Sequence, residues 1–370
     1  MPSQILHTLF GEDVIYEIYR RVKDRFGVVA EKALDRIQAV HKKVFALGCQ
    51  GPDIFYHSQI RRPVGLEYGT LLHRRGVGNL TAGLLKMGLP DPPPDAEDIR
   101  LGRREKGINA LGVYALGFMT HAILDRQAHP YIVYKSDRPP PENPRRDRSH
   151  AFFERIIDLL MLKRLRNEKI SCWDQEGILA DTCRNPPLGL KELLARTIVQ
   201  AYPERAGKDE KLVSRIENTF LDCADFYKYT APANTMIKKP VQLPFPLQKG
   251  FVAYLYPEKL SSDIDYLNLK KKPWYYPAGE AEEDLRSFPE IYEDAVKFAA
   301  DSITVLISRY LEKGFFPIED AAIAIGNGGL SIVDENGKPC TLTRTEPLPL
   351  QAVLDEQAAM RSIAAMQGLA

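Results

Sequence analysis

The sequence has little of several features that would narrow its function at once. Its 370 residues carry 50 Lys and Arg against 49 Asp and Glu, a net charge of +1, so no overall field favours nucleic acid or an anionic membrane. The five cysteines form no CxxC pair, and their odd number argues against a disulfide framework. The most apolar stretch, INALGVYALGFMTHAIL at 108–124, is shorter than the roughly 20 residues of a membrane span. The first residues, MPSQILHTLFGEDV, have no basic segment before a long apolar one. These absences predict a soluble, cytoplasmic protein without a transmembrane segment.

Helical patterning, in contrast, is abundant. In 13–27, apolar side chains recur with a spacing close to 3.6 residues, and a glycine ends the run. Similar patterns predict further helices over 28–48, 67–86, 105–128, 148–167, 188–201, 209–229 and 284–313. The fold class expected is therefore mainly α and multi-helical.

Irregular structure is expected in three places. Proline predicts loops over 130–147 and 231–282, and an Asn-Gly pair within 331–343 predicts a β-hairpin. We therefore expect a helical metal-binding catalytic domain over 1–315 and a short mixed C-terminal appendage over 316–370.

Two of the seven histidines lie beside a carboxylate in HAILDRQAHP, where His121, Asp125 and His129 follow at intervals of four. In a helix this spacing places all three on one face, although the proline after His129 predicts that the helix ends there. The pair His150 and Glu154 repeats the spacing. Histidine and carboxylate at i, i+4 suit zinc, and also manganese or iron, but such pairs also form ordinary hydrogen bonds. From spacing alone both interpretations remain open.

Further candidate donors precede this motif. They are His7, Asp53 in QGPDIFY and His73 in GTLLHRR. Asp53 follows a Gly-Pro pair, so on its own it would be interpreted as a turn residue.

Taken in order, these donors resemble those of the zinc-dependent phospholipase C family and the related single-strand-specific nucleases. The series that carries the resemblance, over roughly residues 1–160, is His7, Asp53, His73, His121, Asp125, His129, His150 and Glu154. The resemblance implies a helical bundle with a cluster of zinc ions. It assigns one zinc to Asp53, His73, His121 and Asp125. It assigns a second to His129, His150 and Glu154, and a third to His7 and a shared Asp125.

The resemblance departs from the family pattern at the third zinc. Secreted members bind that ion through an N-terminal tryptophan, whereas this chain begins MPSQILH and has no tryptophan before Trp173. Two zinc ions are therefore expected, and the third is left open.

The function implied by the resemblance is that of a zinc-dependent phosphodiester hydrolase of the phospholipase C type. In such an enzyme a metal-activated hydroxide attacks phosphorus, and Asp53 would be both ligand and catalytic base. The substrate would be a phosphodiester, which includes a phospholipid headgroup, and the balanced net charge does not favour nucleic acid. The alternatives are a single-strand-type nuclease, a soluble phosphodiesterase and a non-catalytic metal-binding protein.

Aromatic and basic side chains could extend such a site. Phe55, Tyr56 and the aromatics of 272–277 could line a headgroup pocket or simply pack in the core. An arginine cluster before His150 could contact phosphate or be solvated; its members are Arg145, Arg146 and Arg148.

Overall fold

A computed structural model describes residues 4–90, 96–97, 108–138, 148–235, 249–280, 282–313 and 318–366. About 70% of the described residues are helical, and the sheet found among them consists of two short strands, so the predicted mainly α, multi-helical fold class is confirmed. Among the described helices, none is both long enough and apolar enough to cross a bilayer.

The first half of the chain supplies most of the bundle. It forms α1 (Gln4–Phe26), α2 (Val28–Asp35), the π-helical η1 (Arg36–Val40), α3 (Lys42–Gly48), the 3-10 segment η2 (Gly51–His57), α4 (Leu66–Arg74), α5 (Val77–Gly88), α7 (Ala110–Ser136) and α8 (Ser149–Arg166).

The second half covers this framework. It forms η3 (Ile170–Cys172), η4 (Glu176–Ala180), α9 (Asp181–Arg184), α10 (Leu190–Ala201), α11 (Pro203–Ala206), α12 (Leu212–Thr230), α13 (Pro232–Thr235), η5 (Lys249–Tyr254), the antiparallel strands β1 (Trp274–Tyr275) and β2 (Glu283–Asp284), α14 (Phe288–Lys313), α15 (Ile318–Ile325) and α16 (Leu350–Met366).

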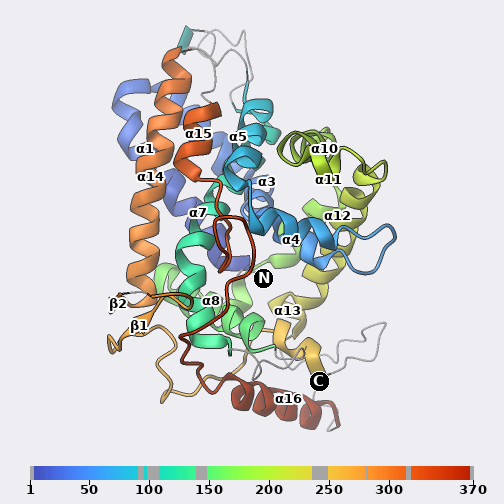
Figure 1. Ribbon diagram of the computed structural model, residues 1–370, viewed down its shortest axis with the longest axis vertical. Coiled ribbons are helices and arrows are strands. Elements are labelled where there is room, and N and C mark those ends of the chain that lie inside the picture. Colours follow the sequence, from blue (N-terminus) through green and yellow to red (C-terminus); the bar gives the residue numbers. More distant parts are fainter. Residues whose placement is uncertain are drawn as a thin grey trace.

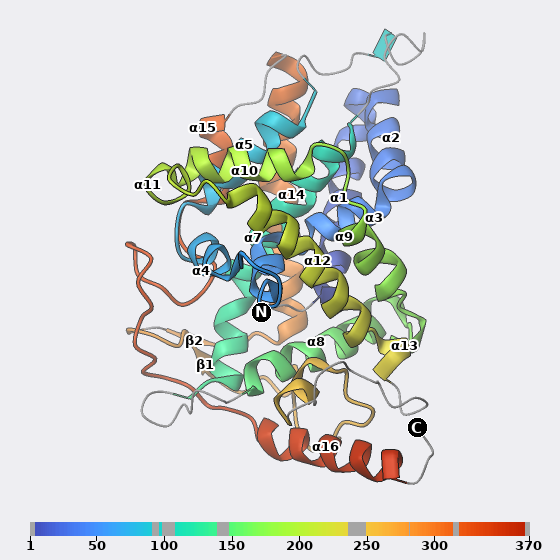
Figure 2. The same ribbon diagram turned by 90° about the vertical axis from the view of Figure 1, so that its right-hand side faces the viewer.

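Helix α7 is the centre of the fold. It contacts α1, α3, α5, α8 and α14, and it is buried continuously from Gly112 to Leu124. A helix that is apolar on all sides, as this one is, belongs in a core. Figure 1 shows α1 and α14 side by side along one edge, and Figure 2 shows α16 crossing the end of the molecule below α8.

Two glycines allow α3 to approach α7 closely. A Cβ on Gly48 would lie 2.3 Å from the Tyr114 carbonyl oxygen, and one on Gly117 would lie 2.6 Å from that of Phe45. Any larger residue would push the helices apart. This crossing fixes the end of α3 beside the middle of α7, where His121 lies.

The first turn of α1 is stabilised by a distant residue. The Asp158 carboxylate of α8 accepts hydrogen bonds from the backbone N–H groups of Ile5 (3.3 Å) and Leu6 (2.7 Å). These amides would otherwise be unsatisfied at a helix start. With this cap α1 begins at Gln4, nine residues before the helix predicted for 13–27, and His7 lies within it. The prediction missed this start because the capping residue is far away in sequence.

Two other predicted boundaries were wrong. The single helix expected over 67–86 is two, α4 and α5, because Gly76 adopts a left-handed conformation with φ of 73°. The loop expected from 130 begins only after Ser136, since Pro130 lies inside α7. Burial of Tyr131 and Ile132 beyond the proline offsets the cost of about 3 kcal/mol that a helical proline carries.

The C-terminal segment packs on the helical body. Helix α15 contacts α5, and the following loop runs along α4, where the Leu330 amide donates to the His73 carbonyl (2.8 Å). At the predicted hairpin, an antiparallel bridge joins Val333 and Pro339 across the Asn-Gly turn, without longer strands on either side. The domain boundary predicted at 315/316 falls outside the described residues.

Candidate metal centre

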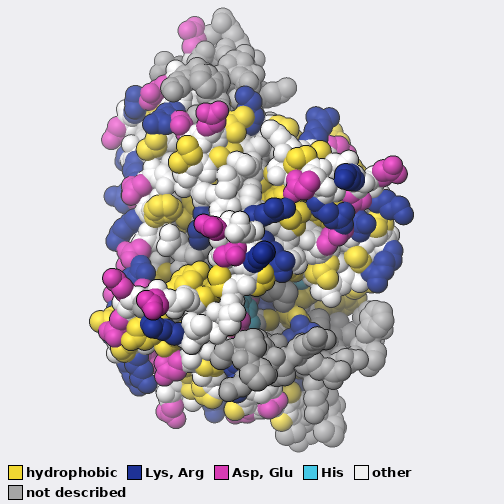
Figure 3. Space-filling view, in the orientation of Figure 1, with side chains coloured by type: hydrophobic (Ala, Val, Ile, Leu, Met, Phe, Trp, Pro, Cys, Tyr) yellow, Lys and Arg dark blue, Asp and Glu magenta, His cyan; other side chains and the backbone are white. Residues whose placement is uncertain are grey.

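Five elements bring the eight predicted donors to one region of the bundle. Helix α1 carries His7, η2 carries Asp53, α4 carries His73, α7 carries His121, Asp125 and His129, and α8 carries His150 and Glu154. Figure 3 shows a small area of histidine surface in a recess near the middle of the face drawn there. Segments far apart in sequence therefore converge. The three donors of α7 face different elements: His121 lies near η2, Asp125 near α4 and His129 near α8.

The Gln-Gly-Pro-Asp turn positions Asp53. The Gln50 amide nitrogen donates to carbonyl oxygens of α1 and α3, those of Gln4 (3.2 Å) and Ala46 (3.1 Å). Gly51 follows with φ of 54°, and a Cβ there would lie 2.3 Å from the His121 ring. Glycine is thus required twice, for the turn and for the approach to the imidazole. Pro52 lies in the first turn of η2, and Asp53, the next residue, faces the histidines.

The first predicted ligand set is compact. His73 Nε2 lies 2.9 Å from Asp53 Oδ1 and 4.0 Å from Asp125 Oδ2, while His121 Nε2 lies 3.8 Å from Asp53 Oδ2. Ligand atoms around a tetrahedral zinc lie about 3.3 Å apart, given bonds near 2.0–2.1 Å. The donors His73, His121 and Asp125 all lie within 4.8 Å of one another, and so do those of His7, Asp53 and His121. Either triad could hold a metal ion.

The imidazole rings are oriented by their outer nitrogens. His73 Nδ1–H donates to the Gly69 carbonyl oxygen (2.7 Å), and His121 Nδ1–H donates to that of Cys49 (3.0 Å). A carbonyl only accepts, so Nδ1 carries the proton in both rings and Nε2 keeps its lone pair. Outer hydrogen bonds of this kind are typical of metal-binding histidines.

Several of these buried atoms have no hydrogen-bond partner. They are Nδ1 of His7 and His129, Nε2 of His73 and His121, Oδ1 of Asp53 and Oδ2 of Asp125. A single unsatisfied buried polar atom is costly, and a cluster of them is rare in a native protein. A bound cation would satisfy them together, so the donor set fits a metal.

His7 reaches the centre from α1. Its ring stacks on that of His121 with centroids 4.0 Å apart. A small cavity of about 20 Å³ lies beside it, bounded on its polar side by His7, Asp125, His129 and Glu154. That is room for one water molecule or ion. The third position, with His7 and a shared Asp125, therefore has donors and space.

The second predicted ligand set lies at the other side of Asp125. His129 Nδ1 lies 3.3 Å from Asp125 Oδ1, and the rings of His129 and His150 are 5.1 Å apart. His150 Nε2 lies 3.3 Å from Glu154 Oε1. The three predicted ligands are thus neighbours, but among the described residues they do not form a triad with all donor atoms within 4.8 Å of one another, as the first set does.

Asp137, which we did not identify from the sequence, belongs to this side of the centre. Its Oδ1 lies 2.8 Å from His150 Nδ1, so it orients the ring as the carbonyls orient His73 and His121. It stands directly after α7 and two residues before the proline run of 139–141. Only the length of α7 beyond Pro130 brings it to His150.

The charges of the centre are strongly coupled. Burial lowers the pKa of His7 to about 3, and the neighbouring His121 adds to the effect. Burial also lowers the pKa of His150, but Asp137 and Glu154 outweigh it and raise that pKa to about 10. For Asp53, burial raises the pKa, yet the histidines His121 and His73 hold it below its ordinary value. The carboxylate is therefore ionised at neutral pH, as a metal ligand must be.

The aromatic and basic candidates separate into core and rim. Phe55 is fully buried, and Trp274 packs edge-on against Tyr131, which favours the packing interpretation for both. Tyr56 lies over the His73 ring at 4.7 Å. Arg148 is exposed and donates to the Tyr254 hydroxyl (2.9 Å). Two further predicted arginines, Arg145 and Arg146, lie outside the described residues.

Comparison with known proteins leaves the family open, because no protein-family model, curated protein or solved structure matches this chain.

Proposed function

We propose that the chain is a zinc-dependent phosphodiester hydrolase of the phospholipase C type. One observation supports this proposal. Of the eight donors that the resemblance assigns to zinc, five form two compact triads that share His121, and several of their nitrogen and oxygen atoms are unsatisfied. The other three, His129, His150 and Glu154, lie next to them on the far side of Asp125. Such convergence is not needed to build a helical core, where apolar residues would pack at lower cost.

Bound zinc would neutralise phosphodiester oxygens and lower the pKa of a water molecule. The chain's own residues hold the geometry for this chemistry. Carbonyl oxygens of Gly69 and Cys49 fix the rings of His73 and His121, and the walls of α1 and α7 exclude bulk water. Asp53, ionised and in reach of both rings, is the group that would accept the proton.

A closed, non-catalytic metal site is the second candidate. His121 and Asp53 are 0% and 2% exposed, and closed coordination is typical of structural zinc. Catalysis needs a route to solvent, which His150 provides on the rim with a side chain 23% exposed. A nuclease has less support, since the net charge of +1 supplies no broad attraction for nucleic acid.

The test combines metal content with hydrolysis. The full chain, purified without chelator, is analysed for metals and then assayed on bis(p-nitrophenyl) phosphate, short-chain phosphatidylcholine and single-stranded DNA. We expect about two equivalents of zinc or more and cleavage of the phosphatidylcholine at the glycerol–phosphate bond. Bound metal without hydrolysis of any of the three would favour the structural site. DNA cleavage without lipid cleavage would favour the nuclease. Less than one equivalent of metal would overturn both metal proposals.

A further inference from the structure

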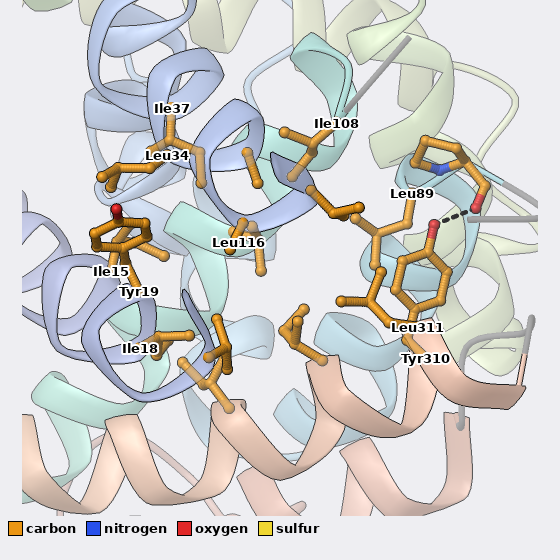
Figure 4. Close-up of a pocket in the computed structure, with 17 residues that line it drawn as sticks. Ile15, Ile18, Tyr19, Leu34, Ile37, Leu89, Ile108, Leu116, Tyr310 and Leu311 are labelled. Carbon is orange, nitrogen blue, oxygen red and sulfur yellow. Dashed lines mark hydrogen bonds between the residues drawn. The ribbon is translucent and has the colours of Figure 1, made fainter. Parts of the chain in front are cut away.

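A second cavity lies away from the metal donors. It is a narrow cleft of about 100 Å³ between α1, the α2–η1 segment and α14, with α7 behind it. Figure 4 shows that aliphatic side chains point into it from these elements, with Leu116 in the middle. No charged side chain lines it, and the hydroxyl of Tyr310 at one end donates to the Pro90 carbonyl. The cleft is therefore suited to an apolar group and not to a phosphate or a nucleotide.

The shape of the cleft indicates which apolar group would fit. Its lining runs along α1 from Ile15 to Val22 and along α14 from Ile303 to Leu311. At 1.5 Å per residue this is about 12 Å. A space that is long and narrow fits an extended alkyl chain better than a ring system.

A polar cavity adjoins the cleft. Its charged lining residues are Glu12, Asp13, Lys42 and Arg166, and Ile15 and Ile37 line both this cavity and the apolar cleft, so the two are adjacent. Ile37 belongs to η1, a π-helical turn closed by the His41 amide and the Arg36 carbonyl (2.8 Å). Turns of this kind widen a helix and occur frequently at functional sites.

The charges of the polar cavity balance one another. Arg166 pairs with Asp13 (2.6 Å) and, more loosely, with Glu12 (3.6 Å), which also lies 3.7 Å from Lys42 Nζ. Two cations thus face two carboxylates. A head with a net charge would meet a like charge as well as an opposite one, whereas an uncharged head can hydrogen-bond to both kinds of group.

From this arrangement we infer that the two cavities bind a single-chain amphiphile whose polar head has no net charge. The alkyl chain lies in the apolar cleft, and the head lies among Lys42, Arg166 and Glu12. No residue that lines the cleft is a candidate metal ligand, so this inference does not depend on the proposed hydrolase activity.

The test uses three ligands with the same ten-carbon chain: 1-decanoylglycerol, decanoate and decylammonium. Each is titrated calorimetrically, below its micellar concentration, into the full chain. We expect saturable binding of 1-decanoylglycerol at one site and binding about tenfold weaker for the two charged ligands. Equal binding of all three would overturn the assignment of the head, and no binding of 1-decanoylglycerol would overturn the inference.

Two alanines provide matched variants. Ala33→Leu fills the cleft, while Ala39→Leu adds the same side chain to an exposed position on η1. Excluding about two methylenes of the ligand weakens binding about tenfold, so Ala33→Leu should bind 1-decanoylglycerol about tenfold more weakly, whereas Ala39→Leu should bind it like the wild type. Should Ala33→Leu not fold, Ile307→Ala widens the cleft instead and should shift the preference towards longer chains. An unchanged preference there would contradict the location.

Discussion

Asp137 Oδ1 lies 2.8 Å from Nδ1 of His150, on the side of the ring away from Glu154. The pair joins the end of α7 to the first turn of α8. As in His73 and His121, Nδ1 of His150 is bound on the outer side, and its Nε2 faces Glu154, the other ligand predicted for the same ion.

This relationship predicts that Asp137→Ala weakens zinc binding at the second ligand set. Loss of an outer partner typically costs about 10–100-fold in metal affinity, because the ring is no longer fixed in position and tautomer. Asp137→Asn keeps an oxygen that can accept from Nδ1–H, so its loss should be smaller. Competition with a zinc chelator measures both. Asp35→Ala, at an exposed position on α2, is the control, and equal affinities for all four proteins would refute the role of Asp137.

The second prediction concerns the close approach of Gly51 to His121. Gly51→Ala would bring a Cβ to 2.3 Å from the ring at a φ of 54°. Gly27→Ala is the matched control, because its φ is 47° and nothing lies within 4 Å of the added atom. Both carry the left-handed penalty of about 1–2 kcal/mol, and Gly51→Ala should cost about 1–3 kcal/mol more from the clash.

Urea denaturation and zinc stoichiometry, measured on both glycine variants, separate the two effects. Gly27→Ala should keep the full metal content, whereas Gly51→Ala should lose metal from the first ligand set. Equal destabilisation with metal retained in both would show that His121 tolerates the contact.

The sequence was informative where a local pattern decides the structure. Periodic apolar residues predicted the helical class, and the i, i+4 spacing placed His121 and Asp125 on one face. It was uninformative where distant residues decide it. Asp158 of α8 caps the start of α1. The Arg126 guanidinium donates to the carbonyls of Gly326 and Gly328 in the C-terminal loop. Each contact joins segments far apart in the chain, and no local sequence pattern predicts it.

Asp137 shows the same limit at the site itself. A proline at position 130 predicted the end of the helix, so the residues beyond it were expected in a loop. The burial of Tyr131 and Ile132 continues α7 past the proline and carries Asp137 to His150. Tertiary packing, which no single-sequence pattern contains, therefore supplied the missing member of the site.

A third prediction concerns acid stability and uses His57, which is not among the predicted ligands. Burial lowers the pKa of His57 to about 3, and its Nε2 has no hydrogen-bond partner. Between about pH 6.5 and 3 the unfolded chain binds a proton there that the folded chain does not. His57 therefore leaves the free energy of unfolding unchanged above pH 6.5 and lowers it by about 1.4 kcal/mol for each pH unit between 6.5 and 3.

His57→Phe should remove this dependence, because the new ring can keep the stacking on Phe226, whose centroid lies 3.7 Å from that of His57. The free energy of unfolding of both proteins is measured in chelator at pH 7 and pH 4.5. The wild type should lose more stability than the variant on acidification. Parallel losses would mean that His57 is protonated in the folded state.

The last prediction tests the role of Asp53 as ligand and base. Its two oxygens lie 2.9 Å from His73 Nε2 and 3.8 Å from His121 Nε2, within reach of a metal between the rings and of a water molecule beside it. Asp53→Asn keeps the size and one oxygen but cannot accept a proton, and a general base contributes about 10²–10⁴-fold to a rate. We therefore expect a loss of about 100-fold or more in kcat on a phosphodiester, with at least part of the zinc retained. Glu67→Gln, on the exposed side of α4, is the control for the loss of a carboxylate. Zinc content and kcat are measured on the same preparations, because loss of all metal would indicate a ligand role alone. Full activity with full metal content in Asp53→Asn would exclude both roles.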